Sequence, residues 1–191
     1  MSGGEIVIKA TPERKYTPHE CIILGNTVMY GATGGALFAN GRGGERFCVR
    51  NSGGTAVVEG AGDHCCEYMT NGTVVVMGAT GKNFGAGMTG GVAYVLDLEE
   101  EFLSRYNPQL ITPSRLEKEE DITELKGLIY KHLERTESQI AREILADWQT
   151  YSQKFWKVSP TVPAAKPVLP ETDKTKAEAG QVINENVTAS R

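Results

Sequence analysis

A short glycine-led segment recurs at an almost constant interval through the first half of the chain. Successive copies start at residues 34, 53, 71 and 90, which are 19, 18 and 19 residues apart. The copies are Gly34–Gly41, Gly53–Gly60, Asn71–Gly78 and Gly90–Asp97, and Gly3–Ala10 fits the same pattern. Each copy places β-branched or aromatic residues after its glycines, as strands do. A period this short is too small for a pair of helices, and it fits one coil of a β-solenoid.

Two apolar positions return within each period. Four residues after each start lie Phe38, Val57, Val75 and Tyr94, and thirteen residues after the first three starts lie Phe47, Cys66 and Phe84. Equivalent strands of a solenoid pair about 4.8 Å apart, so each set is expected to stack as a ladder through the interior. Glycines are expected at the corners, where the backbone turns sharply and often at positive φ. We therefore predict a mainly β fold, a right-handed parallel β-helix with coils of about 19 residues.

Composition divides the chain into three parts. Of the 22 glycines, 20 precede residue 97, and four of the 8 prolines follow residue 157. The predicted parts are a partial β-helix at residues 1–97, a helical extension at 98–156 and a disordered tail at 157–191. The tail is rich in Pro, Lys, Glu and Ala. A segment of that composition buries too little apolar surface to offset the entropy of ordering it.

The extension contains two apolar stripes with helical spacing. Each follows the spacing of a capping box, at Asp121–Glu124 and at Thr136–Gln139. The stripes are Ile122, Leu125, Leu128, Ile129 and Leu133, then Ile140, Ile144, Leu145, Trp148 and Tyr151. We expect two amphipathic helices that dock as a hairpin, preceded by a short acidic helix at 97–106. These helices are the candidate cap for the C-terminal end of the solenoid, because an end coil exposes an apolar face and strand edges.

The N-terminal end of the solenoid has no comparable candidate for a cap. Residue 3 already falls within a coil, so we expect earlier coils, or a partner, to cover this end. Met1 is then interpreted as an internal methionine of a longer chain. The stretch between Lys9 and Glu20, which contains Pro12 and Pro18, interrupts the repeat and is expected to bulge outward as a loop.

Charge and cysteine content narrow the class of protein. The formal net charge of −4 favours neither nucleic acid nor an acidic membrane surface as a partner. No apolar stretch approaches the ~18 residues of a membrane span, and the N-terminus lacks the basic and apolar runs of a secretion signal. The cysteines, Cys21, Cys48, Cys65 and Cys66, include no C-x-x-C pair. They are interpreted as reduced thiols of a cytosolic protein.

One segment, Asp63–Glu67, gathers an acid, a base and a nucleophile in five residues. A thiol nucleophile needs partners that converge in space, whereas neighbours on a strand point to opposite faces. Cys66 also shares its place in the repeat with Phe47 and Phe84, which assigns it to the core. A structural role is therefore the preferred interpretation of this segment.

The other candidates for chemistry are also better explained by structure. Glycine clusters at 41–43, 60–62 and 85–87 are each followed by another strand, whereas a dinucleotide fingerprint needs a helix there. The histidines, His19, His64 and His132, lie in different blocks without the spacing of a zinc site. The basic residues Arg42, Arg46 and Arg50 are expected to form a solvated rim, or ion pairs with Glu45 and Glu59. We predict no catalytic, cofactor-binding or metal-ligating residue in this chain.

Long motifs in the solenoid resemble those of one known family. They are Gly31–Gly35, Gly44–Phe47, Val49–Gly53, Val57–Met69 and Asn83–Gly91. From about residue 3 to residue 151 the chain is similar to the C-terminal glycine-rich (GXGXG) β-helix domain of the glutamate synthase large subunit. Asp121–Trp148 resembles the helices that follow that domain, and residues 148–156 resemble the ferredoxin-dependent type more than the pyridine-nucleotide type. The chain therefore looks like a C-terminal fragment of such an enzyme.

The resemblance implies an activity for the full enzyme and a supporting role for this part of it. The family makes two glutamates from glutamine and 2-oxoglutarate. An amidotransferase domain releases ammonia, and a central domain uses FMN and an iron–sulfur cluster. These two domains and, through the full enzyme, ferredoxin are the implied partners, in the cytoplasm or, for a plastid-bearing source, the plastid stroma. The β-helix domain is regarded as structural, and none of the family's nucleophile, flavin-binding or cluster-binding motifs lies in these 191 residues.

Two alternatives remain open. Similar glycine-rich solenoids occur as stand-alone assembly subunits of other oxidoreductases, and formylmethanofuran dehydrogenase has a subunit of this kind. Neighbouring genes would discriminate that case, and the appended helices favour the synthase. A β-helix enzyme acting on polysaccharide would use a carboxylate cluster, for which Glu59, Asp63 and Glu67 are the candidates. No sugar-stacking aromatic residues surround them in the sequence, so this alternative ranks below the others.

Overall fold

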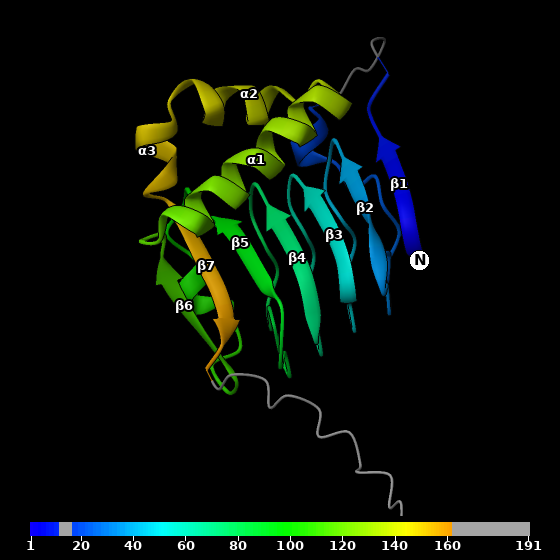
Figure 1. Cartoon of the computed structure of the whole chain (residues 1–191), viewed down its shortest axis with the longest axis vertical. Helices are drawn as coiled ribbons and strands as arrows, with labels where there is room; N and C mark the ends of the chain where they lie inside the picture. The colour runs from blue at the N-terminus through cyan, green and yellow to red at the C-terminus, as the bar shows by residue number, and fades with distance from the viewer. Residues whose placement is uncertain (12–16, 162–191) are drawn as a thin grey trace, which may run out of the picture.

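The computed structural model describes residues 1–11 and 17–161, and its first half winds into a β-solenoid of about three turns. Five strands pair in parallel and in chain order (Figure 1): β1 (Ser2–Ile8), β2 (Gly34–Ala39), β3 (Ser52–Val58), β4 (Asn71–Val76) and β5 (Val92–Leu96). Phe38 pairs with Val57, Val57 with Val75, and Val75 with Tyr94. The predicted column on adjacent parallel strands is therefore confirmed, and Val7 of β1 extends it by one residue.

Between strands the chain returns through a second wall built from turns. Every second residue of this wall has a positive φ, as in Arg46, Cys48 and Arg50 of one coil. The Arg46 amide donates to the carbonyl of Asp63 in the following coil at 2.8 Å, and the Cys48 amide donates to Val28 in the preceding coil at 2.9 Å. A left-handed non-glycine residue costs roughly 1–2 kcal/mol. The hydrogen bonds to both neighbouring coils offset that cost and hold the wall in register.

The interior of the coils and the outer face of the strands form two separate apolar clusters. The interior cluster contains Leu37, Val58 and Val76 together with Phe47, Cys66 and Phe84, and all six are buried. The column from Phe38 to Tyr94 points the other way, because successive residues of a strand alternate between faces. It packs against the helices. The expectation that this column stacks in the interior is therefore wrong, since it lies beneath the helical layer.

Three helices lie over the outer face of the sheet (Figure 1): α1 (Glu119–Thr136), α2 (Gln139–Ala146) and α3 (Trp148–Ser152). Leu125 and Ile129 of α1 and Ile144 of α2 are buried in the same cluster as the column, so the predicted amphipathic hairpin is confirmed. Its second helix was expected to continue through Tyr151, but it breaks at Asp147 into α2 and α3. The expected place of the hairpin, at the end of the solenoid, is wrong, because the helices cover the face of the sheet. Within the described residues, no helix is long and apolar enough to cross a membrane.

The helices start at other residues than the capping-box spacings predicted. α1 begins at Glu119, after Lys118, whose side chain makes no capping hydrogen bond. Acidic residues fill the first turn of α1, where they interact favourably with the helix dipole. α2 begins after Ser138, whose Oγ accepts a hydrogen bond from the Ala141 amide at 3.1 Å. A single 3₁₀ turn, η1 (Pro18–Glu20), precedes the second wall of the first coil.

Two further strands close the C-terminal end of the solenoid. β7 (Phe155–Pro160) pairs antiparallel with β5, and β6 (Ile111–Arg115) pairs antiparallel with β7. Residues 157–160 thus form a strand where the disordered tail was predicted to begin. The reason is burial on both faces, because Phe155 packs in the helix-side cluster and Val158 in the interior cluster. The remainder of the predicted tail, residues 162–191, lies outside the described residues.

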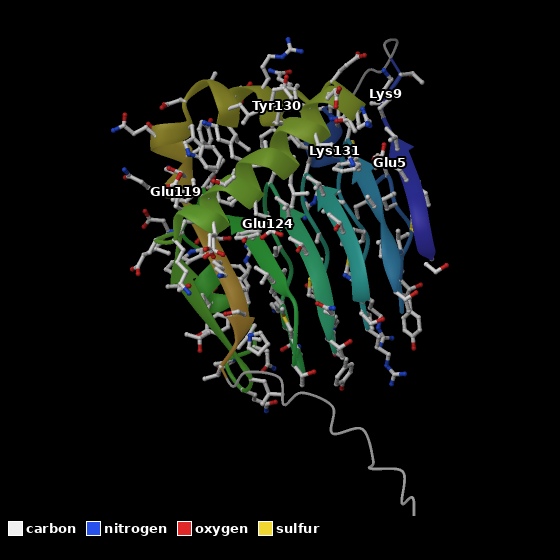
Figure 2. The ribbon with its side chains drawn as sticks, viewed as in Figure 1. Glu5, Lys9, Glu119, Glu124, Tyr130 and Lys131 are labelled. Atoms are coloured by element: carbon white, nitrogen blue, oxygen red, sulfur yellow. The ribbon has the colours of Figure 1, made fainter. Side chains whose placement is uncertain are left out.

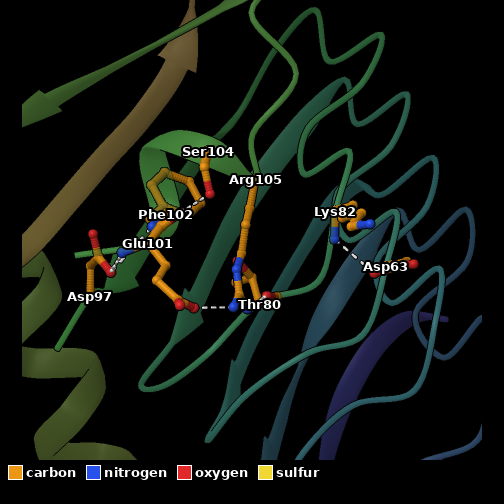
Figure 3. A network of polar contacts seen from close by, with 8 residues as sticks. All are labelled: Asp63, Thr80, Lys82, Asp97, Glu101, Phe102, Ser104 and Arg105. Atoms are coloured by element: carbon orange, nitrogen blue, oxygen red, sulfur yellow. Dashed lines mark hydrogen bonds and ion pairs between the residues drawn. The ribbon is translucent and has the colours of Figure 1, made fainter. Parts of the chain in front are cut away.

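A polar network fastens the turn that follows β5 (Figure 3). The acidic helix predicted at 97–106 is reduced there to a 3₁₀ turn, η2 (Phe102–Ser104). Asp97 Oδ1 accepts from the Glu101 amide at 2.9 Å, and Arg105 donates to the Glu101 carboxylate and to the carbonyl of Thr80. Phe102 packs edge-on against Phe84, with ring centroids 5.2 Å apart. The turn therefore seals the interior core of the last coil.

Candidate functional site

α1 crosses the outer face of the sheet as a strap whose polar side chains reach several strands (Figure 2). The contacts are Glu5 of β1 with Lys131 at 2.8 Å and Arg135 at 2.7 Å, Tyr94 of β5 with Glu124 at 2.8 Å, and Lys157 of β7 with Asp121 at 2.7 Å. Lys9, just after β1, also contacts Glu137 at 2.9 Å. Exposed ion pairs contribute little one by one, but these contacts lie at both ends of α1 and set its direction across the strands.

A buried carboxylate fastens the middle of this helix–sheet contact. Glu59, which follows β3, has a side chain only 1% exposed. Its Oε1 atom accepts from Asn40 Nδ2 of the preceding coil at 2.7 Å and from the Ser138 hydroxyl, and it lies 3.4 Å from His132 Nε2. An ionised carboxylate only accepts hydrogen bonds, so Nε2 is the His132 nitrogen that carries a proton here. The cluster joins two coils to both helices of the hairpin.

The hydrogen bonds at this cluster keep Glu59 ionised. Burial acts to raise the pKa of the Glu59 carboxyl, but the hydrogen bonds from His132, Ser138 and Asn40 outweigh it and leave the pKa below its usual range. His132 Nδ1 is also buried and has no hydrogen-bond partner among the described residues. A buried carboxylate that keeps its charge depends on all of its partners, so the cluster is sensitive to the loss of any one of them.

Sequence reasoning named Glu59 and His132 separately and did not bring them together. The two residues are 73 positions apart, which no local spacing can connect. The sequence does contain one indication of this contact. His132 and Thr136 continue the apolar stripe of Leu125 and Ile129 at helical intervals, and in the structure they are buried with it. A polar residue on a buried stripe needs a polar partner on the facing surface.

The basic residues do not make the predicted ion pairs. Arg46 Nη2 lies 3.8 Å from Glu67 Oε2, and Glu59 pairs with His132 in place of an arginine. Arg42 lies against Gly60, and its Nε atom is buried without a hydrogen-bond partner among the described residues. Of the two expectations, the ion pairs with Glu45 and Glu59 are wrong, because the coil spacing brings Glu67 beside Arg46. Arg46 and Arg50 are exposed, as expected of a solvated rim.

The side chains of the segment Asp63–Glu67 lie partly in the core and partly near the surface. Cys65 and Cys66 are buried, with their sulfur atoms 3.7 Å apart, and burial raises the pKa of the Cys65 thiol well above its usual value. A thiol of that kind is a poor nucleophile at neutral pH. His64 Nδ1 lies 3.6 Å from Glu67 Oε1 near the surface. Asp63 Oδ1 accepts from the Lys82 amide at 2.7 Å and fixes a corner (Figure 3).

Two pockets of the molecule differ in size and in the residues that line them. One beside Thr80, Asp97 and Arg105 holds about 30 Å³, which is room for one water molecule. A wider depression of about 660 Å³ lies on the outer side of α1 and is lined by Ile122, Tyr130, Leu145 and Trp148 among others. Within residues 1–11 and 17–161, no three His, Cys, Asp or Glu side chains gather closely enough to hold a metal ion. The absence of catalytic and cofactor-binding residues stays a prediction.

Replacing Tyr94 by phenylalanine is expected to loosen the N-terminal half of α1. The Tyr94 hydroxyl donates to Glu124, and burial together with Glu124 raises the pKa of Tyr94. Loss of one such bond to a charged acceptor should lower the free energy of unfolding by about 1.5–3 kcal/mol, measured by urea denaturation. Tyr130→Phe, at a side chain that is 65% exposed, is the control and should change little. Equal stability of Tyr94→Phe and the unchanged chain would contradict this role.

Glu59 is expected to make stability depend on pH in the acidic range. Because its folded-state pKa is lowered, its contribution is fully present above the unfolded pKa of about 4.3 and is lost as the pH falls through the folded value. At pH 7 the unchanged chain should therefore have a larger free energy of unfolding than the Glu59→Gln variant, and this difference should shrink below about pH 4. Urea denaturation at a series of pH values measures it. A difference that does not change with pH would refute the assignment.

Comparison with known proteins accounts for the whole described structure. Residues 1–161 match the GXGXG motif family. Over 160 residues, 84% of the chain, it is 54% identical to ferredoxin-dependent glutamate synthase 2 of Synechocystis sp. and 49% identical to ferredoxin-dependent glutamate synthase 1 of Arabidopsis thaliana. It is 46% identical to glutamate synthase [NADH] of Schizosaccharomyces pombe. The chain spans 10% of the length of the first two relatives and 8% of the third. With its repeat, its solenoid and this match in agreement, the chain belongs to the GXGXG motif family.

Proposed function

We propose that this chain serves as the structural β-helix domain of a glutamate synthase of the ferredoxin-dependent type. The observation that carries the proposal is the 54% identity to a ferredoxin-dependent glutamate synthase over 160 residues, 84% of the chain. The same relatives favour this role over an assembly subunit of another oxidoreductase. In the whole enzyme, glutamate would be made from glutamine and 2-oxoglutarate, with electrons from ferredoxin. The location would be the cytoplasm or the plastid stroma.

The role of this domain would be positional. Successive coils are hydrogen-bonded to one another, and α1 ties β1, β5 and β7 together across the outer face. A body built in this way resists bending, because any change of angle between coils must break several hydrogen bonds at once. It could therefore hold an ammonia-producing domain and an ammonia-consuming domain at a constant separation, which protects a product that would otherwise escape to solvent.

The redox groups of such an enzyme would be held by its other domains. FMN needs a site for its phosphate and an iron–sulfur cluster needs three or four cysteine thiolates. Cys48, Cys65 and Cys66 are all fully buried in the described structure, where they pack as small apolar side chains. The described residues therefore do not fit an iron–sulfur cluster, and no step of the reaction is assigned to them.

A chimera tests the proposed function. Residues 1–161 would replace the aligned segment of the Synechocystis ferredoxin-dependent glutamate synthase 2, and glutamate formation would be measured with glutamine, 2-oxoglutarate and reduced ferredoxin. We expect activity within about tenfold of the parent enzyme, since the exchanged segment supplies position only. His64→Ala in the chimera is the matched control and should retain that activity. A folded, flavin-loaded chimera without activity, or stoichiometric flavin bound to the isolated chain, would contradict the proposal.

A further inference from the structure

An open apolar depression lies on the outer side of the helical layer. Its larger part, of about 660 Å³, lies between α1 and the residues where α2 gives way to α3. A smaller part of about 220 Å³ continues it toward the end of β6, and Ile122 lines both parts. The apolar side chains of the two parts are Leu116, Ile122, Tyr130, Leu145 and Trp148. Each of the five is half-buried or exposed, so the depression presents apolar surface to solvent.

Two cations flank this depression, and each is held over a tryptophan ring. Arg115 lines the smaller part, and its guanidinium carbon lies 3.5 Å from the centroid of the Trp156 ring. Lys126 lines the larger part, and its Nζ atom lies 5.4 Å from the centroid of the Trp148 ring. Neither cation forms an ion pair with a carboxylate of the described residues. The depression therefore suits a segment that carries carboxylates beside apolar side chains.

The chain itself carries such a segment a few residues beyond the described part. Val168 and Leu169 are followed at short intervals by Glu171 and Asp173, and Lys166 precedes them. Composition alone predicts that this stretch is disordered, because it has too little apolar surface to bury against itself. The depression supplies the apolar partner that the stretch lacks.

The segment also begins within reach of the depression. The Thr161 amide donates to the Leu110 carbonyl at 2.8 Å, which places Thr161 next to the start of β6. From there β6 runs along the edge of the sheet toward the start of α1 (Figure 1). Five rises of about 3.3 Å separate Leu110 from Arg115, roughly 17 Å in all. An extended chain covers that distance with about five residues, so Lys166 and the residues after it can reach the depression.

From this we propose that residues 166–173 of this chain bind in the depression as an extended segment. The apolar pair of the segment lies on the apolar floor, its two carboxylates meet Lys126, and its lysine meets Glu119, which also lines the depression. Pro167 and Pro170 bracket the apolar pair, and segments rich in proline bind to grooves lined by aromatic side chains in a preformed extended conformation. Because the segment is tethered, its effective concentration is on the order of millimolar. A contact too weak to join two separate molecules is therefore sufficient.

A charge exchange in the full chain tests the contact with Lys126. The readout is the NMR order parameter of the Val168 and Leu169 amides, which is about 0.85 for rigid backbone and below about 0.6 for flexible backbone. We expect values above about 0.6 in the unchanged chain, and values below it in Lys126→Glu, because the substitution replaces an attraction by a repulsion. Adding Glu171→Lys and Asp173→Lys to Lys126→Glu should restore the higher values.

Lys82→Glu is the matched control for the charge exchange. It makes the same change of charge at an exposed residue of the second wall, away from the helices, and should leave both order parameters unchanged. Values below about 0.6 in the unchanged chain would overturn the proposal. Values that Lys126→Glu leaves unchanged, or that the added lysines do not restore, would also overturn it.

The signal of the Trp148 indole N–H tests the same contact from the side of the depression. Replacing Val168 and Leu169 by serine in the full chain should shift this signal, whereas replacing Val182 and Ile183 by serine, further along the same tail, should not. Equal signals in the two variants would overturn the proposal. A difference that grows with protein concentration would assign the depression to the tail of a second copy and would overturn it as well. None of these readouts depends on glutamate synthase activity.

Discussion

Replacing Gly72 by alanine is expected to lower the free energy of unfolding by about 2–5 kcal/mol, enough to unfold much of a marginally stable chain. Gly72 has a φ of +97°, and an added Cβ would overlap the carbonyl oxygen of Gly54 and lie 2.8 Å from Asn51 Nδ2. The backbone cost is roughly 1–2 kcal/mol, and overpacking between two coils adds roughly 1–3 kcal/mol. Neither coil can move away, because β3 and β4 are hydrogen-bonded on both sides.

Gly127 provides the matched control for Gly72→Ala. It lies in the middle of α1 on an exposed surface, and nothing lies within 4 Å of an added Cβ. Gly127→Ala should therefore raise the free energy of unfolding by about 1 kcal/mol, the difference in helix propensity between the two residues. Urea denaturation of both variants, followed by circular dichroism, measures the contrast. Similar midpoints for Gly72→Ala and the unchanged chain would mean that the coils are not packed as described.

The repeat was sufficient to predict which residues pair, because in a solenoid each strand residue pairs with the residue one repeat period later in the chain. The register of Phe38, Val57 and Val75 follows directly from starts 19 and 18 residues apart. The face on which they lie did not follow. A strand covered on both sides is apolar at successive positions, so its sequence does not reveal which face is the interior.

The apolar stripes of the helices could also be predicted from the sequence, but the surface against which they pack could not. An amphipathic pattern specifies that a helix buries one face and leaves open which surface it covers. β7 was not predicted for a related reason. Phe155 and Val158 precede a proline-rich stretch, so their segment looks like the start of a disordered tail. Their burial depends on β5, about sixty residues earlier in the chain, which no local pattern records.

The pair of Glu59 and His132 joins these two layers, and its loss is expected to have an effect as large as that of Gly72→Ala. His132→Leu removes a buried partner of an ionised carboxylate, which typically costs about 3–5 kcal/mol. Both side chains are at most 1% exposed, so water does not replace the lost contact. The hairpin should come away from the sheet first, because only its helices depend on this contact, while the coils keep their own hydrogen bonds.

A double-mutant cycle separates this pair from a loss of packing alone. Glu59→Met and His132→Leu each leave a polar partner without its counterpart, whereas the double variant places two apolar groups against each other, with Asn40 and Ser138 unpaired. The double variant should therefore be more stable than the sum of the single effects by about 1–3 kcal/mol. Hydrogen exchange should quicken in α1 and α2 of the single variants more than in β3 and β4. Additive effects, or uniform loss of protection, would show that Glu59 and His132 are buried side by side without a coupling that holds the helices on the solenoid.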